Sequence, residues 1–245
     1  AELAIKKDKH LFIEKPITKY LYEANQLIKL SENKNIKIQV GHVERFNAAY
    51  KAIKEHCNKP MFIESHRLAE FNPRGTDVPV VHDLMIHDID IILKIVNSKV
   101  KQIDASGVSI ISETPDIANA RILFDSGCVA NLTASRISFK NMRKTRIFQK
   151  HAYISVDYLE KKAEIIRMKN TDKIEDPFSI IIDPGEGKIK KEIQFRNPNI
   201  KENNAIKDEL TSFYKSIIKD IETEVTIHDA KDALYIADQI TKKIK

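Results

Sequence analysis

The side chains best suited to proton chemistry lie in one stretch, residues 80–95. Asp83, His87, Asp90 and Lys94 follow one another at offsets of four, three and four residues, and in an α-helix such residues share one face. The apolar residues between them recur with a period near 3.6, which predicts an amphipathic helix. A carboxylate one turn before an imidazole favours the protonated ring and fixes its orientation. Asp83 and His87 therefore predict a histidine prepared for proton transfer near neutral pH.

Other interpretations of this helix stay open. Any surface helix carries a polar stripe, so the spacing alone does not require a function. A carboxylate and a histidine four residues apart also have the spacing of metal ligands, although no clear third ligand stands nearby. The pairs His82-Asp83 and His87-Asp88 would suit a metal-dependent phosphohydrolase. That class would need a mostly helical domain and a further histidine upstream, and the strand-rich second half of the chain argues against it.

Two predicted strands near the start of the chain end in further polar residues. Glu14-Lys15-Pro16 ends a short apolar strand at residues 10–13, and His42 and Arg45 follow the strand at residues 37–41. A helix is expected between the two strands, which makes the connection a right-handed parallel crossover. Ligands bind at the carboxyl ends of the strands in such sheets. These polar residues are therefore candidates for one site, although Lys15 alone also fits a solvated lysine before a turn.

From residue 61 onward, strands dominate the pattern. Asp125-Ser126-Gly127 is a clear hairpin signal, and sequential strands with local turns imply a largely antiparallel sheet. Residues 170–187 are expected to form a loop, with turns at Pro177 and Asp183-Pro184-Gly185. The expected helices cover residues 1–7, 19–33, 48–57, 80–95, 204–222 and 229–244, and the expected strands cover residues 10–13, 37–41, 61–68, 99–110, 118–124, 128–137, 145–148, 152–157, 164–168 and 190–195.

The composition excludes several classes of protein. The 245 residues are 42% hydrophobic and 31% charged, as in ordinary globular proteins, and no run approaches the ~20 apolar residues of a membrane span. The net charge of +6 comes from 41 basic and 35 acidic side chains that are dispersed. Without a long basic run or an aromatic platform, we expect anionic small molecules rather than nucleic acid as partners. Two distant cysteines, Cys57 and Cys128, and no secretory signal predict a reducing, cytoplasmic location.

Four motifs, taken in order, carry a resemblance to a known family. They are Glu14-Lys15-Pro16, Val40-Gly41-His42-Val43-Glu44-Arg45-Phe46-Asn47, Asp83-Leu84-Met85-Ile86-His87 with Asp90, and His228-Asp229-Ala230. The ordered set resembles the glucose–fructose oxidoreductase and inositol dehydrogenase (Gfo/Idh/MocA) family of NAD(P)-dependent sugar dehydrogenases, over essentially the whole chain. The middle motifs are most similar to the UDP-N-acetylglucosamine 3-dehydrogenase branch. No single motif is specific, whereas the ordered set is fairly specific.

The resemblance implies a fold and an assembly. The fold would be an α/β remnant of a Rossmann domain followed by an α+β domain with a large, mainly antiparallel sheet. Residues 1–44 would be the remainder of the dinucleotide-binding domain, residues 45–203 the substrate and dimerisation domain, and residues 204–245 helices that pack back on the nucleotide domain. We expect a homodimer or homotetramer formed through the sheet. A scaffold or dimerisation module without catalysis is an alternative, because a broad apolar sheet face usually finds a partner.

The resemblance also implies the roles of individual residues. Lys15 would reach the reacting sugar hydroxyl and the nicotinamide ribose, and a cis Lys15–Pro16 bond would shape the cofactor edge. His87 would be the acid–base residue beside the reacting carbon, and Asp83 would orient it and bind a sugar hydroxyl. No metal is implied. The residues expected to contact NAD or NADP are Glu14, Lys15, Pro16, His42 and Arg45.

A nucleotide sugar is the expected substrate. Arg67, Arg74 and Arg136 are candidates for its diphosphate, because guanidinium groups match phosphate oxygens, although each also fits a surface or sheet-face arginine; Arg136 is slightly favoured. One departure from the family concerns glycine: the six glycines are scattered, without the G-x-G-x-x-G turn that holds the pyrophosphate. We therefore expect the chain to start late in the nucleotide-binding domain, to bind the dinucleotide weakly or not at all, and to be inactive alone.

Overall fold

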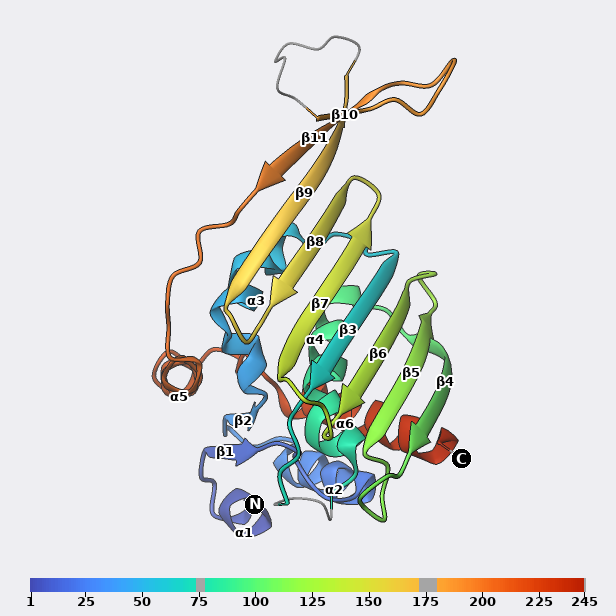
Figure 1. Ribbon diagram of the computed structural model, residues 1–245. Helices are drawn as coiled ribbons and strands as arrows, with labels where there is room; N and C mark the ends of the chain where they lie inside the picture. The colour runs from blue at the N-terminus through green and yellow to red at the C-terminus, as the bar shows by residue number, and fades with distance from the viewer. Residues whose placement is uncertain (74–77, 172–179, 245) are drawn as a thin grey trace.

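The computed structural model describes residues 1–73, 78–171 and 180–244, and its architecture confirms the expected fold class (Figure 1). The first part of the chain forms a two-stranded parallel sheet, in which Leu11 pairs with Ile38 and Glu14 with Gly41. Apolar side chains of both strands and of the intervening helix meet in a small core. The elements are α1 (Glu2–Lys6), β1 (Leu11–Glu14), α2 (Leu21–Ser31) and β2 (Ile38–Gly41).

The second part is a nine-stranded sheet in the order β10-β11-β9-β8-β7-β3-β6-β5-β4. All neighbours are antiparallel except β3 and β6, which run parallel. Buried residues alternate with more exposed ones along β3 and β8, so one face of the sheet packs on the core and the other stays open. The strands are β3 (Phe62–Leu68), β4 (Val100–Val108), β5 (Ile117–Phe124), β6 (Val129–Ser135), β7 (Met142–Gln149), β8 (Ala152–Asp157), β9 (Lys162–Asn170), β10 (Ile180–Ile182) and β11 (Lys191–Arg196).

Helices cover the inner face of this sheet, as Figure 1 shows. Helix α6 joins the two halves of the molecule, because Ala230 and Leu234 enter the small core while Ala237 and Ile240 enter the large one. Among the described residues, no helix is long and apolar enough to cross a bilayer. The helical elements are η1 (Val43–Phe46), α3 (Ala48–Ile53), η2 (Lys54–His56), η3 (Val81–Met85), α4 (Ile86–Val96), α5 (Ala205–Ile218) and α6 (Ile227–Lys243).

Turn and cap residues account for where several elements begin and end. Gly127 adopts a φ of 84° in the hairpin between β5 and β6, which confirms the expected turn. Thr226 caps α6 by accepting a hydrogen bond from the Asp229 backbone. Helix α5 ends four residues earlier than expected, because Asp220 takes a left-handed φ of 51° just after it. The expected loop 170–187 contains β10, and the turn expected at Pro177 lies outside the described residues.

Candidate active site

Lys15 brings the end of β1 to the start of the segment that carries His87. The Lys15 ammonium donates to the Asp83 carbonyl oxygen at 2.7 Å and to Asp83 Oδ1 at 3.2 Å. The Lys15–Pro16 peptide bond is cis, as the resemblance implied. Lys15 is about one-fifth exposed, with 20% of its side chain accessible. A cation at the carboxyl end of a parallel strand is therefore fixed beside the histidine segment.

Asp83 does not hold His87, contrary to the expectation from their spacing. The residues Val81–Met85 form a π-helical turn, η3, that precedes α4. Hydrogen bonds in a π-helix run from residue i to residue i+5, so side chains four residues apart no longer lie above one another as in an α-helix. The carboxylate of Asp83 consequently pairs with Lys15. Asp83 is a partner of the lysine, and the expected orientation of His87 by Asp83 is wrong for this structure.

His87 is half-buried and neutral. Burial lowers the pKa of His87 well below 6.5, and the positive charges of Arg67, Lys15 and Arg143 lower it further. Its Nδ1 atom is buried without a hydrogen-bond partner among the described residues. The expected protonated ring is therefore also wrong, because burial and the neighbouring positive charges dominate the pKa of His87. A neutral imidazole near pH 7 can accept a proton, which is the role that a general base requires.

His42 lies against His87 from the end of β2. The two rings meet edge to face with centroids 6.5 Å apart, and His42 is 1% exposed. Burial lowers the pKa of His42, an effect that the Asp90 carboxylate 3.9 Å away partly opposes. His42 is therefore a buried neutral neighbour of the candidate base.

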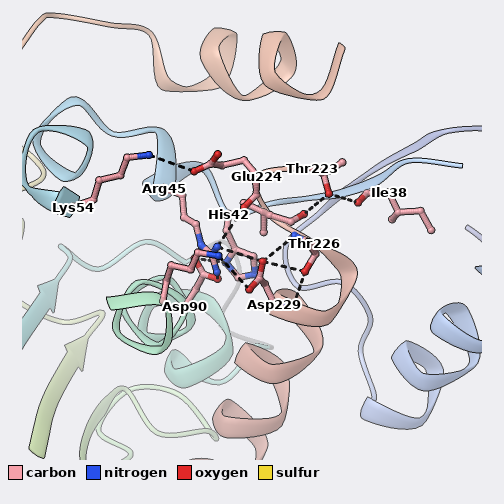
Figure 2. Close-up of polar contacts among 11 residues, drawn as sticks. Ile38, His42, Arg45, Lys54, Asp90, Thr223, Glu224, Thr226 and Asp229 are labelled. Atoms are coloured by element: carbon pink, nitrogen blue, oxygen red, sulfur yellow. Dashed lines mark hydrogen bonds and ion pairs between the residues drawn. The ribbon is translucent and has the colours of Figure 1, made fainter. Parts of the chain in front are cut away.

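Arg45 is a structural residue of the core rather than part of an open cofactor edge. Its Nε and Nη2 atoms donate to the two carboxylate oxygens of Asp90 at 2.7 and 2.6 Å, and Nη1 contacts Asp229 at 3.4 Å (Figure 2). Arg45 is 3% exposed. The expected contact with the cofactor is therefore replaced by an ion pair that joins η1 to α4 and α6. A cavity of about 610 Å³ lies beside Arg45 and α6, and neither Lys15 nor His87 lines it.

The expected diphosphate arginines are also engaged within the fold. Arg67 is 2% exposed and donates to Asp88 at 3.0 and 2.8 Å and to Glu44 at 2.9 Å. Arg136 is buried, donates to the Val78 carbonyl and lies 3.9 Å from Asp116. These two expectations are wrong because both guanidinium groups neutralise or satisfy buried acceptors. Arg74 lies outside the described residues.

Arg143, which the sequence analysis did not single out, has an accessible guanidinium at the site. Its side chain is 48% exposed, and its charge acts on His87. The signal in the sequence was weak, because Arg143 lies near the start of an ordinary alternating strand. Only the pairing of that strand with β3 shows that Arg143 lies opposite Arg67.

The two His-Asp pairs do not form a metal centre. His82 Nε2 lies 2.8 Å from Asp238, whereas Asp88 binds Arg67, so the pairs point to different partners. In residues 1–73, 78–171 and 180–244, no group of three or more His, Cys, Asp or Glu side chains could hold a metal ion. The structure therefore gives the phosphohydrolase interpretation no metal site. What the site does offer is a neutral imidazole and a fixed ammonium, suited to moving one proton.

Comparison with known proteins identifies what this arrangement is similar to. Residues 58–155 match the sequence profile of the GFO/IDH/MocA C-terminal domain. The UDP-N-acetylglucosamine 3-dehydrogenase of Acidithiobacillus ferrooxidans is 36% identical over 166 residues, which cover 67% of this chain and 53% of that protein. The chain thus spans about half the length of this curated relative.

Solved structures extend the similarity over nearly the whole chain. A structure of that same Acidithiobacillus ferrooxidans enzyme superposes with a TM-score of 0.87 at 27% identity, covering 99% of this chain and 74% of the other. Levoglucosan dehydrogenase in complex with NADH superposes with a TM-score of 0.80 at 16% identity, covering 99% of this chain and 73% of the other. At that low identity the second likeness concerns the fold alone.

Proposed function

Residues 58–155 place this chain in the GFO/IDH/MocA family through its C-terminal domain, and on that premise we propose that it carries the sugar-oxidising site of an NAD(P)-dependent dehydrogenase. The observation that carries the proposal is the contact of the Lys15 ammonium with Asp83, 3.2 Å from its carboxylate, one turn before a neutral His87. A fixed cation at the carboxyl end of a parallel strand, with a neutral base on the adjoining helix, is what oxidation of a hydroxyl group requires.

The proposed chemistry divides between these two side chains. Oxidation of a carbinol removes a hydride from carbon and a proton from oxygen, and NAD or NADP would supply the hydride acceptor when bound. His87 takes the hydroxyl proton, because its ring is neutral. Lys15 donates a hydrogen bond to the same oxygen and stabilises the charge that develops there. Asp83 positions Lys15.

The residues present fit only the nicotinamide end of the cofactor. Lys15 and Pro16 follow β1 directly, at the edge where parallel sheets bind ligands. About one-fifth of the Lys15 side chain is accessible there. Arg45, in contrast, is committed to Asp90. We therefore assign Glu14, Lys15 and Pro16 to the cofactor edge and leave Arg45 out of it.

The proposed substrate is a nucleotide sugar of the UDP-N-acetylglucosamine type. The 36% identity to a UDP-N-acetylglucosamine 3-dehydrogenase supports it, as does the net charge of +6, which favours anionic substrates. The test is a titration of the protein, labelled with ¹³C at histidine and lysine, with UDP-N-acetylglucosamine. We expect signals of His87 and Lys15 to shift saturably, and no shift at either residue would contradict the proposal. Both cysteines are free thiols, in keeping with the cytoplasmic location that we propose.

We also propose that two copies associate through the open face of the large sheet. An aromatic and apolar row, defined here as Phe62, Phe148, Tyr153, Ile166 and Phe195, crosses five adjacent strands in register. Phe62 and Phe148 lie 6.0 Å apart between ring centroids, and Phe148 and Tyr153 lie 5.0 Å apart. Phe195 is 63% exposed. An extended row of this kind on a flat face favours packing against the same face of a second sheet.

A further inference from the structure

Arg143 is the one partner in a buried ionic chain that reaches the accessible side of the site. The chain runs from Asp88, which follows His87 directly, to Arg67 at 2.8 Å, from Arg67 to Glu44 at 2.9 Å, and from Glu44 to Arg143 at 3.4 Å. Asp88, Arg67 and Glu44 are buried, whereas 48% of the Arg143 side chain is exposed. Arg143 is thus the solvent-exposed end of an ionic chain that begins at Asp88, next to His87.

The register of the sheet fixes the side from which Arg143 acts. Arg67 on β3 and Arg143 on β7 are directly opposed, so their side chains lie on the same face of the sheet. That face carries the core, because Thr145 and Ile147, the next residues of β7 on the same side, are buried. Arg143 is therefore the first inward-facing residue of β7, at the rim where the core ends and the site begins.

The contact between Arg143 and Glu44 contributes little to the stability of the fold. Glu44 is already satisfied by Arg67 at 2.9 Å and by the Asn47 amide at 3.1 Å, so the longer contact from Arg143 adds little, as is usual for exposed ion pairs. Only Nη1 of Arg143 makes this contact, and no other atom of its guanidinium forms a hydrogen bond within the described part of the chain. The fork formed by Nε and Nη2 remains open, and such a fork binds two oxygens of one phosphate group.

We propose that Arg143 binds the phosphate nearest the sugar and thereby determines specificity for a nucleotide sugar. This inference rests on the proposed function. Asp88 follows His87 directly and is linked through Arg67 and Glu44 to Arg143, so an anionic substituent of a sugar bound at His87 would meet the open fork from the solvent side. A sugar acid would offer a carboxylate of similar geometry, which the experiment separates from a phosphate.

The experiment compares Arg143→Gln with Arg146→Gln on the same strand. Arg146 has the same 48% side-chain exposure and pairs with Glu64, but it lies three residues further along β7 and therefore on the opposite face. Isothermal titration calorimetry would measure UDP-N-acetylglucosamine, UDP, N-acetylglucosamine and D-glucuronate. Arg143→Gln should weaken the binding of both UDP ligands about tenfold or more, the effect of losing a charge-assisted hydrogen bond, and should not change the binding of N-acetylglucosamine. Arg146→Gln should leave the affinities for these ligands unchanged.

A second variant, Arg143→Lys, keeps the charge but removes the fork, and it should show an intermediate loss. Equal losses in the Arg143 and Arg146 variants, an undiminished affinity for UDP, or a loss confined to D-glucuronate would each overturn the inference. Arg143→Lys also serves as the folding control for Arg143→Gln. If its Tm equals that of the unsubstituted protein, its weaker binding of UDP does not come from unfolding.

The outcome is separable from that of the proposed function. If UDP-N-acetylglucosamine binds through Arg143 but is not oxidised by a form of the enzyme that also binds NAD or NADP, the inference holds and the dehydrogenase proposal fails. If the substrate is oxidised and Arg143→Gln leaves its KM unchanged, the dehydrogenase proposal holds and the inference fails.

Discussion

The Lys15 ammonium lies 2.7 Å from the carbonyl oxygen of Asp83, although 68 residues separate the two in sequence. The contact joins the end of β1 in the small sheet to the π-helical turn η3 that precedes α4. Because the ammonium also binds the Asp83 carboxylate at 3.2 Å, both the backbone and the side chain of one residue fix its position. The end of β1 and the η3–α4 segment, which pack in separate hydrophobic cores, thereby bring Lys15 and His87 into one site.

Replacement of His87 by glutamine should lower turnover far more than substrate affinity. Glutamine keeps polar atoms in the site but cannot accept the hydroxyl proton, and general-base catalysis typically contributes about 10²–10⁴-fold. We expect kcat for sugar-dependent reduction of NAD or NADP, measured in a form of the enzyme that carries a complete dinucleotide-binding domain, to fall by about that factor, with KM within about threefold of the original. His66→Gln is the matched control, since His66 lies on β3 facing away from the core. A His87→Gln enzyme with unchanged kcat would remove His87 from the proposed role.

Acid should destabilise the protein through two histidines. Burial lowers the pKa values of His42 and His87 from 6.5, so below about pH 6.5 the unfolded chain binds protons that the folded chain does not. The contribution of these two histidines to stability is therefore complete above that pH and falls as the pH decreases, by about 1–3 kcal/mol between pH 7 and pH 5.5, while Glu209, whose pKa is raised, acts in the opposite direction over the same range. Urea unfolding at several pH values would measure this dependence. His42→Gln should flatten it and the exposed His151→Gln should not; equal slopes in all three proteins would contradict the assignment.

The polar residues of α4 show where inference from sequence succeeded and where it failed. The helix and its apolar stripe depend on neighbours along the chain, and the sequence contains those neighbours. Asp90, in contrast, was expected on a polar stripe with His87 and is 1% exposed. It is buried because Arg45, which is 45 residues away in sequence, neutralises it. Pairing of this kind depends on tertiary contacts that no periodicity records.

The same limit applies to the arginines. Arg67 and Arg143 are both arginines on alternating strands, and nothing local distinguishes a buried guanidinium from an exposed one. The strand register places them side by side, and Glu44 then satisfies Arg67 more closely than Arg143. The π-helical turn η3 is a third feature that the sequence did not predict. It separates the Asp83 side chain from His87, and the residue types in this segment do not indicate it.

Removal of Arg45 should destabilise the fold strongly. Asp90 would be left as a buried, unpaired carboxylate, and breaking a buried ion pair in this way costs about 3–5 kcal/mol. We expect Arg45→Met to lower the free energy of unfolding in urea by that amount, and Arg45→Met combined with Asp90→Leu to recover much of it. Lys162→Met is the control, since its pair with Glu160 is 76% and 60% exposed and should contribute about 0–1 kcal/mol. Similar effects of both single variants would contradict a structural role for Arg45.

Glu209 should be a source of instability that grows with pH. Burial raises the pKa of Glu209 to about 8, with further contributions from Glu14 and Asp90, and its Oε1 atom has no partner among the described residues. The folded state therefore holds a proton that the unfolded state releases above its ordinary pKa near 4.5, so stability falls as the pH rises toward 8. Glu209→Gln should raise the free energy of unfolding by about 1–3 kcal/mol near pH 8 and change little near pH 4. Exposed Glu222→Gln is the control, and a uniform effect at both pH values would contradict this account.

A charge placed in the aromatic and apolar row should separate the two copies. Phe148 lies between Phe62 and Tyr153 in that row, with its ring centroid 5.0 Å from that of Tyr153, and a carboxylate there would have to be desolvated when two sheets pack together. We expect Phe148→Glu to convert a dimer into a monomer in sedimentation velocity runs at micromolar concentration, without loss of helix or strand content in circular dichroism. Phe139→Glu is the matched control, because Phe139 is 100% exposed and does not belong to the row. A monomeric unsubstituted protein, or dissociation caused equally by both substitutions, would show that copies do not associate through this face.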